Sequence, residues 1–166
     1  MNLVHLAQAK SPWVLHYDAS SCNGCDIETV ACLTPLYDIE RFGAVPIGSP
    51  KHADMLLVTG NVNHKSKRVL RNIYDQMTEP KVVVAIGICA TSSGVFHQSY
   101  NVLGGADQAV PVDVYISGCP PRPEAIIDAI IMGAEKLKKK WKEEEEHPVK
   151  RSNQGPITER STADVG

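Results

Sequence analysis

The sequence predicts an α/β fold, a doubly wound domain built on a mainly parallel sheet of about four strands. Apolar runs of strand type alternate along the chain with segments of helical periodicity. The apolar runs are continuous in Val, Ile and Leu, which is typical of parallel strands that helices cover on both faces. The predicted strands are residues 11–17 (SPWVLHY), 54–60 (DMLLVTG), 81–88 (KVVVAIGI) and 111–118 (PVDVYISG).

Helical segments follow the predicted strands. Residues 26–42 have a helical pattern that Pro35 interrupts. Residues 65–77 form an amphipathic pattern whose apolar face consists of Val69, Leu70, Ile73 and Met77. A glycine-containing loop with a short helix is expected after the third strand, and a last helix begins near Pro123. That last helix has apolar residues around most of its circumference, more than one face of the sheet can cover. We therefore expect part of it to contact a partner subunit.

Length and composition indicate one domain. The chain has 166 residues, of which 43% are apolar and 22% charged, and this is enough for one sizeable core. We expect residues 1–142 to form a single domain. We expect residues 143–166 to form a polar C-terminal tail, because this segment has few large apolar residues to offset the entropy of ordering.

Charge and hydropathy exclude several functional classes. A net charge of −2 does not indicate the basic surface that nucleic-acid binding requires. The first ten residues, MNLVHLAQAK, do not have the features of a secretion signal. The longest apolar stretch, residues 125–134, contains Asp128 and is shorter than the roughly 20 residues of a spanning helix. In a reducing compartment, cysteines are better interpreted as ligands or reactive thiols than as disulfides.

Four of the five cysteines follow the ends of predicted strands. Cys22 and Cys25 form a C-x-x-C motif after the first strand, Cys89 follows the third, and Cys119 follows the fourth. The carboxyl ends of parallel strands share the edge of the sheet at which ligands bind, so these thiols can converge. Cys32 lies within the next predicted helix and is expected to point elsewhere, as a small buried side chain.

Converging thiols admit several chemistries. A 4Fe–4S cluster takes four thiolates at irregular spacing, and a proline directly after a ligand, as after Cys119, also occurs in ferredoxins. Zinc ribbons usually pair two C-x-x-C motifs, and this chain has one. A dithiol redox site, simple buried thiols and a flavin carrier that uses the same sheet edge are further alternatives. The residues favour the cluster, because glycines that permit close approach to sulfur crowd these loops: Gly24, Gly87, Gly94 and Gly118.

Four motifs carry a resemblance to a known family. They are SCNGCDIE (21–28), LYDIERFG (36–43), GICATSSG (87–94) and PVDVYISGCPPRPEAIIDAI (111–130). Together they resemble the small electron-transfer subunit shared by respiratory complex I and the energy-converting, membrane-bound nickel–iron hydrogenases, over about residues 11–135. The resemblance implies a flavodoxin-like sheet that holds one 4Fe–4S cluster against a large subunit. The implied cluster ligands are Cys22, Cys25, Cys89 and Cys119.

The resemblance also implies roles for other residues. Glu28 matches an acidic residue that the family associates with proton movement near the cluster. Gly24 stands where complex I has the first of two adjacent cysteines, and the separated C-x-x-C resembles the hydrogenase branch. From its place three residues after Cys119, Arg122 can offset cluster charge, bridge to the large subunit, or be a solvated arginine at a helix start. His16, like the other histidines, shows no ligand pairing and is expected to be at the surface or hydrogen-bonded.

The function implied by the resemblance is electron transfer within a membrane-bound, ferredoxin-linked respiratory complex. Electrons would arrive from a ferredoxin-like cluster subunit and leave for the nickel–iron site of a hydrogenase-type large subunit, where protons are reduced to hydrogen. Integral membrane subunits would translocate ions, and this chain would be peripheral on the cytoplasmic face of the cell membrane. A nickel-free, complex I-like sulfur or quinone reductase is the alternative, because nickel ligands would belong to another polypeptide.

Overall fold

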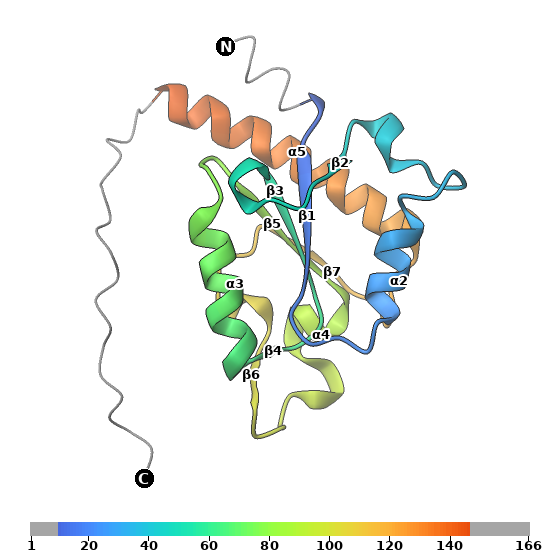
Figure 1. Cartoon of the computed structure of the whole chain (residues 1–166), viewed down its shortest axis with the longest axis vertical. Coiled ribbons are helices and arrows are strands. Elements are labelled where there is room, and N and C mark those ends of the chain that lie inside the picture. Colours follow the sequence, from blue (N-terminus) through green and yellow to red (C-terminus); the bar gives the residue numbers. More distant parts are fainter. Residues whose placement is uncertain (1–9, 147–166) are drawn as a thin grey trace.

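A five-stranded parallel sheet forms the centre of the molecule (Figure 1). The computed structural model describes residues 10–146. The strands are β1 (Trp13–Asp18), β2 (Val45–Pro46), β3 (Met55–Thr59), β5 (Val82–Ile86) and β7 (Val114–Ile116). Their order is β2-β1-β3-β5-β7, and every neighbouring pair is parallel. Counted along the chain this is the order 2-1-3-4-5 of flavodoxin-like sheets, so the predicted fold class is confirmed.

Helices cover both faces of the sheet, as the continuous apolar strands predicted. The long helix α5 (Pro123–Glu146) and the shorter α2 (Gly24–Ala31) pack on one face. On the other face lie α3 (His64–Gln76) and α4 (Gly87–Ser92). Each face of the sheet has its own hydrophobic core, and alternate residues of β3 point into one or the other. Met55 and Leu57 belong to the core under α5, and Leu56 and Val58 belong to the core under α3.

Short elements connect these layers. A small antiparallel pair lies beside the main sheet, formed by β4 (Val62–Asn63) and β6 (Val102–Gly104). The 3₁₀ turns are η1 (Ile39–Phe42), η2 (Pro50–His52), η3 (Gly94–Phe96) and η4 (Ala106–Gln108). At the start of α3, the Asn63 side chain accepts hydrogen bonds from the backbone N–H groups of Lys65 and Ser66, which fixes the first turn of that helix.

Three expectations about the elements need correction. The sheet has a fifth strand, β2, whose two residues are too few to form an apolar run. The helix expected over residues 26–42 ends at Ala31, and the chain passes through turns around Pro35 before η1. Val69 is 46% exposed and does not share the buried face of α3, whereas Leu70 and Met77 are buried.

The last helix buries most of its apolar surface within the chain. Ile126, Ile130 and Leu137 are buried against the sheet, and Ile131 and Met132 stay exposed. Contact of this helix with a partner subunit stays a prediction. The apolar surface available for that contact is limited to its exposed residues, such as Ile131 and Met132. The helix is described through Glu146, and residues 147–166 of the predicted tail lie outside the described residues. Within residues 10–146, every helix is too short or too polar to cross a bilayer.

The carboxyl ends of four strands lie side by side. The last residues pair directly across the sheet: Asp18 with Thr59, Thr59 with Ile86, and Ile86 with Ile116. The segments that follow these residues therefore leave the sheet at one common edge. In open parallel sheets this edge is where ligands bind.

Candidate functional site

Three loops meet at this edge, and each carries cysteine. The Ile88 N–H donates a hydrogen bond of 2.9 Å to the Gly118 carbonyl, so the segment that carries Cys89 touches the segment that carries Cys119. A Cβ placed on Gly24 would lie 3.6 Å from Cys22 Sγ and 3.9 Å from Pro120 Cβ. The C-x-x-C loop therefore packs against the residue that follows Cys119.

The four thiols influence one another electrostatically. Cys25 is buried, Cys89 is half-buried, and Cys22 and Cys119 are exposed. Burial is the main cause that raises the pKa of the Cys25 thiol to about 11. Charges on four neighbours add to the effect: Cys89, Asp26, Cys22 and Cys119. The structure thus brings the predicted ligands to one rim, and their binding of a cluster stays a prediction.

Gly87 provides the closest approach of the backbone to a thiol. It has a φ of +86°, and a Cβ placed on it would lie only 2.5 Å from Cys25 Sγ. Any other residue would therefore displace that sulfur. Gly24 also borders a thiol, whereas a Cβ on Gly94 would meet the Ile88 side chain and one on Gly118 would meet Pro121.

The donor chemistry of the rim is that of soft sulfur ligands. Thiolates suit iron–sulfur clusters and zinc. Among residues 10–146, no group of three or more His, Cys, Asp or Glu side chains is arranged to hold a single metal ion. The four thiols are electrostatic neighbours at this rim.

Cys32 lies away from this rim, as the sequence predicted. It is 1% exposed, and its Sγ donates to the carbonyl oxygens of Glu28 at 3.2 Å and Pro123 at 3.5 Å. Burial raises the pKa of the Cys32 thiol to about 11, and the charge of Glu28 acts in the same direction. This thiol therefore holds α2 to the start of α5 and has no other thiol among its electrostatic partners.

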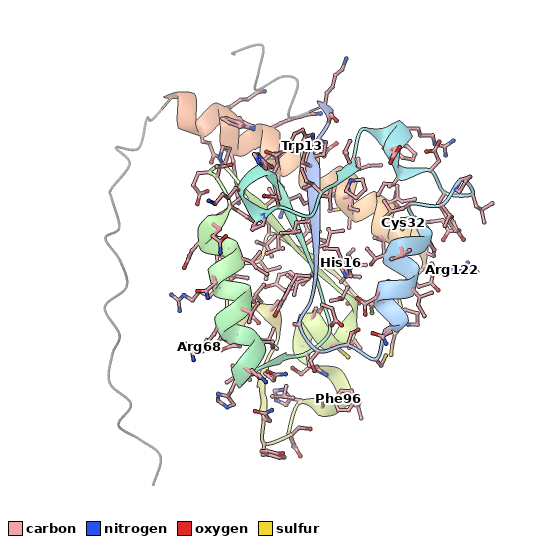
Figure 2. All side chains as sticks on the ribbon, viewed as in Figure 1. Trp13, His16, Cys32, Arg68, Phe96 and Arg122 are labelled. Atoms are coloured by element: carbon pink, nitrogen blue, oxygen red, sulfur yellow. The ribbon has the colours of Figure 1, made fainter. Side chains whose placement is uncertain are left out.

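Asp26 is a site residue that sequence reasoning missed. Its carboxylate accepts hydrogen bonds from the hydroxyls of Ser21 and Thr59, and His16 Nε2 lies 3.0 Å from its Oδ1. Burial alone would raise the pKa of Asp26, but the two hydroxyl donors and the nearby His16 outweigh it and lower that pKa. His16 is thus a hydrogen-bonded residue on β1, as expected, and Figure 2 shows it beside the sheet.

Asp26 and its partners attach the Cys22 loop to the end of β3. The Ala19 N–H donates to the Thr59 carbonyl at 2.9 Å, and the Ser21 N–H donates to Asp18 Oδ1 at 2.8 Å. The only signal for this network in the sequence is an acidic residue in the first turn of a helix, which is common for general reasons.

The remaining predicted residues lie at the surface or close to it. Glu28 is half-buried on α2, and its carbonyl accepts from the Cys32 N–H and thiol. Arg122 is exposed (Figure 2).

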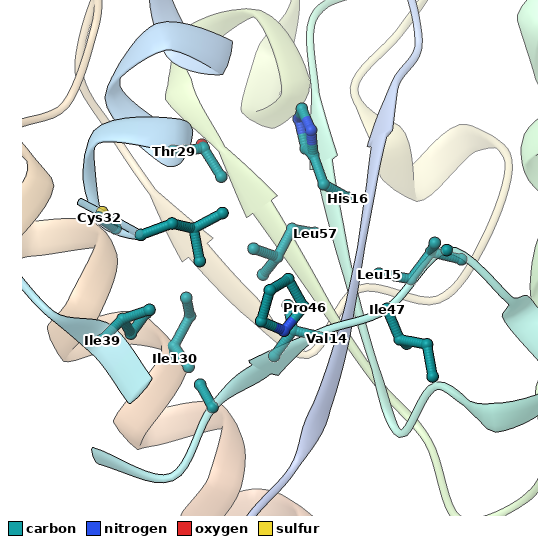
Figure 3. A pocket seen from close by; sticks show the side chains of 13 residues that line it. Val14, Leu15, His16, Thr29, Cys32, Ile39, Pro46, Ile47, Leu57 and Ile130 are labelled. Carbon is teal, nitrogen blue, oxygen red and sulfur yellow. The ribbon is translucent and has the colours of Figure 1, made fainter. Parts of the chain in front are cut away.

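A cavity of about 430 Å³ opens between β1 and α2 (Figure 3). Its walls are mainly apolar and come from β1, β2, α2, η1 and α5. The polar residues that reach it are His16 and Thr29, and the Thr29 hydroxyl donates to the Cys25 carbonyl at 2.8 Å. Of the five cysteines, Cys32 lines this cavity and the four rim cysteines do not.

An exposed apolar surface adjoins the same helix. We call it the α2–η1 surface, and it consists of Ile27, Val30, Leu33, Leu36 and Phe42. Large apolar side chains gathered at the surface mark contact sites for other proteins. The sequence analysis did not identify this surface.

A flavodoxin-like sheet with four thiols at its ligand edge can hold a redox cofactor, as electron-transfer proteins do. Comparison with known proteins gives the family. The family described as "NADH ubiquinone oxidoreductase, 20 Kd subunit" matches residues 22–133. The chain belongs to this family, and it is therefore an electron-transfer subunit of the oxidoreductase class.

Individual relatives come from more than one kind of complex. A probable membrane-bound hydrogenase subunit, mbhJ, of Pyrococcus furiosus is 51% identical over 135 residues, which are 81% of this chain and 81% of that protein. An NADH-quinone oxidoreductase subunit of Leptospira biflexa is 50% identical over 84% of this chain and 71% of its own length. A chain of the archaeal membrane-bound sulfane sulfur reductase superposes with a TM-score of 0.72 at 38% identity, covering 87% of this chain and 82% of its own.

Proposed function

We propose that this chain holds one 4Fe–4S cluster through Cys22, Cys25, Cys89 and Cys119 and passes electrons through it to a catalytic centre in a large partner subunit. The observation that carries the proposal is the meeting of three strand-end loops, which brings these thiols to one rim. When bound, such a cluster supplies reversible one-electron transfer.

The local structure suits a cluster better than a single zinc ion. A tetrahedral zinc site needs four sulfurs at about 2.3 Å from one point. Zinc sites of the ribbon kind usually pair two C-x-x-C motifs, and this chain has one, with Cys89 and Cys119 on separate loops. Gly87 and Gly24 allow the backbone to lie against two of the sulfurs, and backbone groups so placed stabilise anionic clusters.

The proposed reaction is reduction of protons to hydrogen at a nickel–iron site in a hydrogenase-type large subunit. Two observations support this choice: the separated C-x-x-C of Cys22 and Cys25, and the 51% identity to a probable membrane-bound hydrogenase subunit. The electron donor is a ferredoxin-like cluster subunit. The complex includes integral membrane subunits that translocate ions, and this chain is peripheral on the cytoplasmic face of the cell membrane.

A second candidate reaction is reduction of a sulfur compound or a quinone by a nickel-free complex. The likenesses to the sulfane sulfur reductase chain and to the NADH-quinone oxidoreductase subunit support it. In both candidates this chain has the same task, because the catalytic centre belongs to the partner.

The α2–η1 surface fits the large subunit. It begins at Ile27, two residues after Cys25, so a partner that covers it also lies beside the buried thiol of the rim. Electron transfer requires such proximity between donor and acceptor. Burial of the exposed side chains would supply the apolar contact that stable interfaces need.

Glu28 is proposed as a proton relay beside the cluster. We expect Glu28→Gln to retain the cluster and to slow turnover of the complex by about 100-fold, the lower range for loss of a proton-transfer group. Glu135→Gln, a change at an exposed position of α5, is the matched control and should leave turnover unchanged. Unchanged turnover of Glu28→Gln at full iron content would remove Glu28 from the mechanism.

The deciding experiment is anaerobic purification of the whole complex followed by measurement of iron, sulfide, nickel and flavin. Nickel together with hydrogen evolution from reduced ferredoxin supports the first reaction. Iron and sulfide without nickel, together with reduction of sulfur or quinone, supports the second. Flavin bound by this chain, with its cysteines free of iron, would refute the cluster and favour a flavodoxin-like carrier.

A further inference from the structure

A second exposed surface lies on the other side of the rim from the α2–η1 surface. Its apolar part follows α4, the helix that carries Cys89. Val95 is 89% exposed, Phe96 is 45% exposed and Tyr100 is 98% exposed. The Phe96 N–H donates to the Ser93 carbonyl at 2.9 Å, and the Ser93 N–H donates to the Cys89 carbonyl at 2.9 Å. Two successive turns of the chain therefore connect Cys89 to this apolar patch.

Helix α3 brings positive charge beside the apolar patch. Asn63, the residue before α3, pairs with Val102 of β6, so the first turn of the helix lies beside the end of the loop that carries the patch. Lys65 and Arg68 are exposed in this half of α3. Figure 2 shows Arg68 on α3 and Phe96 beyond α4, both in the lower half of the view. We call the whole the α3–η3 surface, and it consists of Lys65, Lys67, Arg68, Val95, Phe96 and Tyr100.

The charges of α3 are not neutralised within the described part of the chain. The helix carries four cationic side chains and one carboxylate, that of Asp75 in its last turn, whereas the whole chain has a net charge of −2. None of the ion pairs among residues 10–146 involves the cations of α3, which are Lys65, Lys67, Arg68 and Arg71. Unpaired cations produce a local positive potential, and this potential attracts an acidic surface.

The composition of the α3–η3 surface is that of a protein-binding site. Tyr, Phe and Arg are enriched at interfaces between proteins, and they carry much of the binding energy there. Anionic lipid also attracts lysine and arginine side chains. Lipid supplies no electrons, however, and this surface adjoins the rim, so its position favours a protein that exchanges electrons with the rim.

The rim lies between the α3–η3 surface and the α2–η1 surface. The Asn61 N–H, three residues before α3, donates to the Ser20 carbonyl at 3.2 Å, so the loop that carries Cys22 adjoins this end of α3. Helices α2 and α3 cover opposite faces of the sheet. A large subunit on the α2–η1 surface therefore leaves the α3–η3 surface free for a second partner.

We propose that the α3–η3 surface binds the electron donor, the ferredoxin-like cluster subunit, through an acidic face of that protein. This inference rests on the proposed function. One electron leaves the cluster of the donor, which is oxidised, and reduces the cluster held at the rim. The transfer breaks no bond and moves no proton. The electron enters from the side of α3 and leaves from the side of α2.

The test is carbodiimide crosslinking of the whole complex, purified anaerobically, followed by mass spectrometry. This reagent joins a lysine amine to a carboxylate where the two groups are in contact. Lys65 and Lys67 should link to Asp or Glu side chains of the ferredoxin-like subunit. The controls are Lys138 and Lys139, which are exposed on the part of α5 remote from the rim. They should form no link to that subunit.

A charge reversal measures how much the cations contribute. Lys65→Glu combined with Arg68→Glu should reduce the amount of ferredoxin-like subunit that copurifies with the complex about tenfold, because two attractive contacts become repulsive. Lys138→Glu combined with Lys139→Glu makes the same change of charge on α5 and should leave that amount unchanged. Equal amounts in the two double variants would overturn the inference.

Failure of the inference and failure of the proposed function are distinguishable. If this chain holds no iron and sulfide in the purified complex, the proposed function itself fails. If the cluster is present and Lys65 and Lys67 link to the large subunit, or to no subunit, the inference is overturned and the cluster stands. Binding of the full-length chain to phosphatidylglycerol vesicles that requires Lys65 and Arg68, without links to the ferredoxin-like subunit, would assign the surface to the membrane and would also overturn the inference.

Discussion

The two ends of α2 each hold a buried cysteine in a different setting. Cys25, near the first turn, is 9% exposed and has three other thiols among its electrostatic neighbours. Cys32, just after the last turn, is 1% exposed and bonds to backbone carbonyls in an apolar core. Burial raises the pKa of both thiols to about 11. Burial and a raised pKa therefore do not distinguish a proposed ligand from a structural cysteine. The presence of other thiols near the sulfur does distinguish them.

The largest expected effect contrasts the rim with the far end of α2. Cys89→Ser should strongly reduce cluster binding, because a serine oxygen is a much poorer ligand of cluster iron than a thiolate. Cys32→Ser should retain a full cluster, since its sulfur contacts only the protein. Iron per reconstituted full-length chain measures both. Equal loss of iron in the two variants would contradict the distinction between the two ends.

A smaller effect is expected from crowding Cys25. Gly87→Ala adds a Cβ 2.5 Å from Cys25 Sγ at a φ of +86°, and the backbone strain alone costs about 1–2 kcal/mol. We expect the cluster to be lost to a chelator roughly tenfold faster. Gly48→Ala is the control, since nothing lies within 4 Å of its Cβ. Similar rates of loss in both variants would show that the backbone at Gly87 does not shape the rim.

The Asp26 network should contribute stability that depends on pH. Because the pKa of Asp26 is lowered on folding, its contribution is present above its unfolded value near 4 and is lost as the pH falls through the folded value. Asp26→Asn should reduce the free energy of unfolding by about 1–2 kcal/mol at pH 7 and by less at pH 3. Urea unfolding at the two pH values measures this.

The control for Asp26→Asn is Asp75→Asn, at an exposed position of α3. It should change the free energy of unfolding little at either pH. A deficit of Asp26→Asn that is the same at pH 7 and pH 3 would argue against an ionised carboxylate in the network.

The smallest effect concerns Cys32 in alkali. Because burial raises the pKa of this thiol from 9.0 to about 11, its contribution is complete below pH 9 and is lost as the pH rises toward 11. Between pH 8 and pH 10 the unchanged chain should lose about 1 kcal/mol more than Cys32→Ala. Urea unfolding at both pH values tests this, and an equal loss in the two proteins would mean that the thiol ionises freely.

The fold was largely predictable because its strands are buried on both faces. Each residue of β3 and of β5 is buried, and such strands read as continuous apolar runs. The strand ends then located the cysteines at one edge. The two-residue β2 has no such run, and the exposed Val69 shows that an apolar residue on a helix need not face the core.

The supporting residues of the rim were not predictable from the sequence. Asp26 acts through Ser21, Thr59 and His16, which come from three separate segments. These residues do not belong to a spacing pattern, so only the pairing of β1 with β3 brings the groups together.

The composition of the group held by the four rim thiols tests the account most directly. Iron, acid-labile sulfide, zinc and flavin should be measured per full-length chain after anaerobic reconstitution, together with the EPR spectrum of the reduced protein. The account predicts about four iron and four sulfide per chain and a signal on reduction. One zinc per chain, or a flavin with no iron, would contradict it.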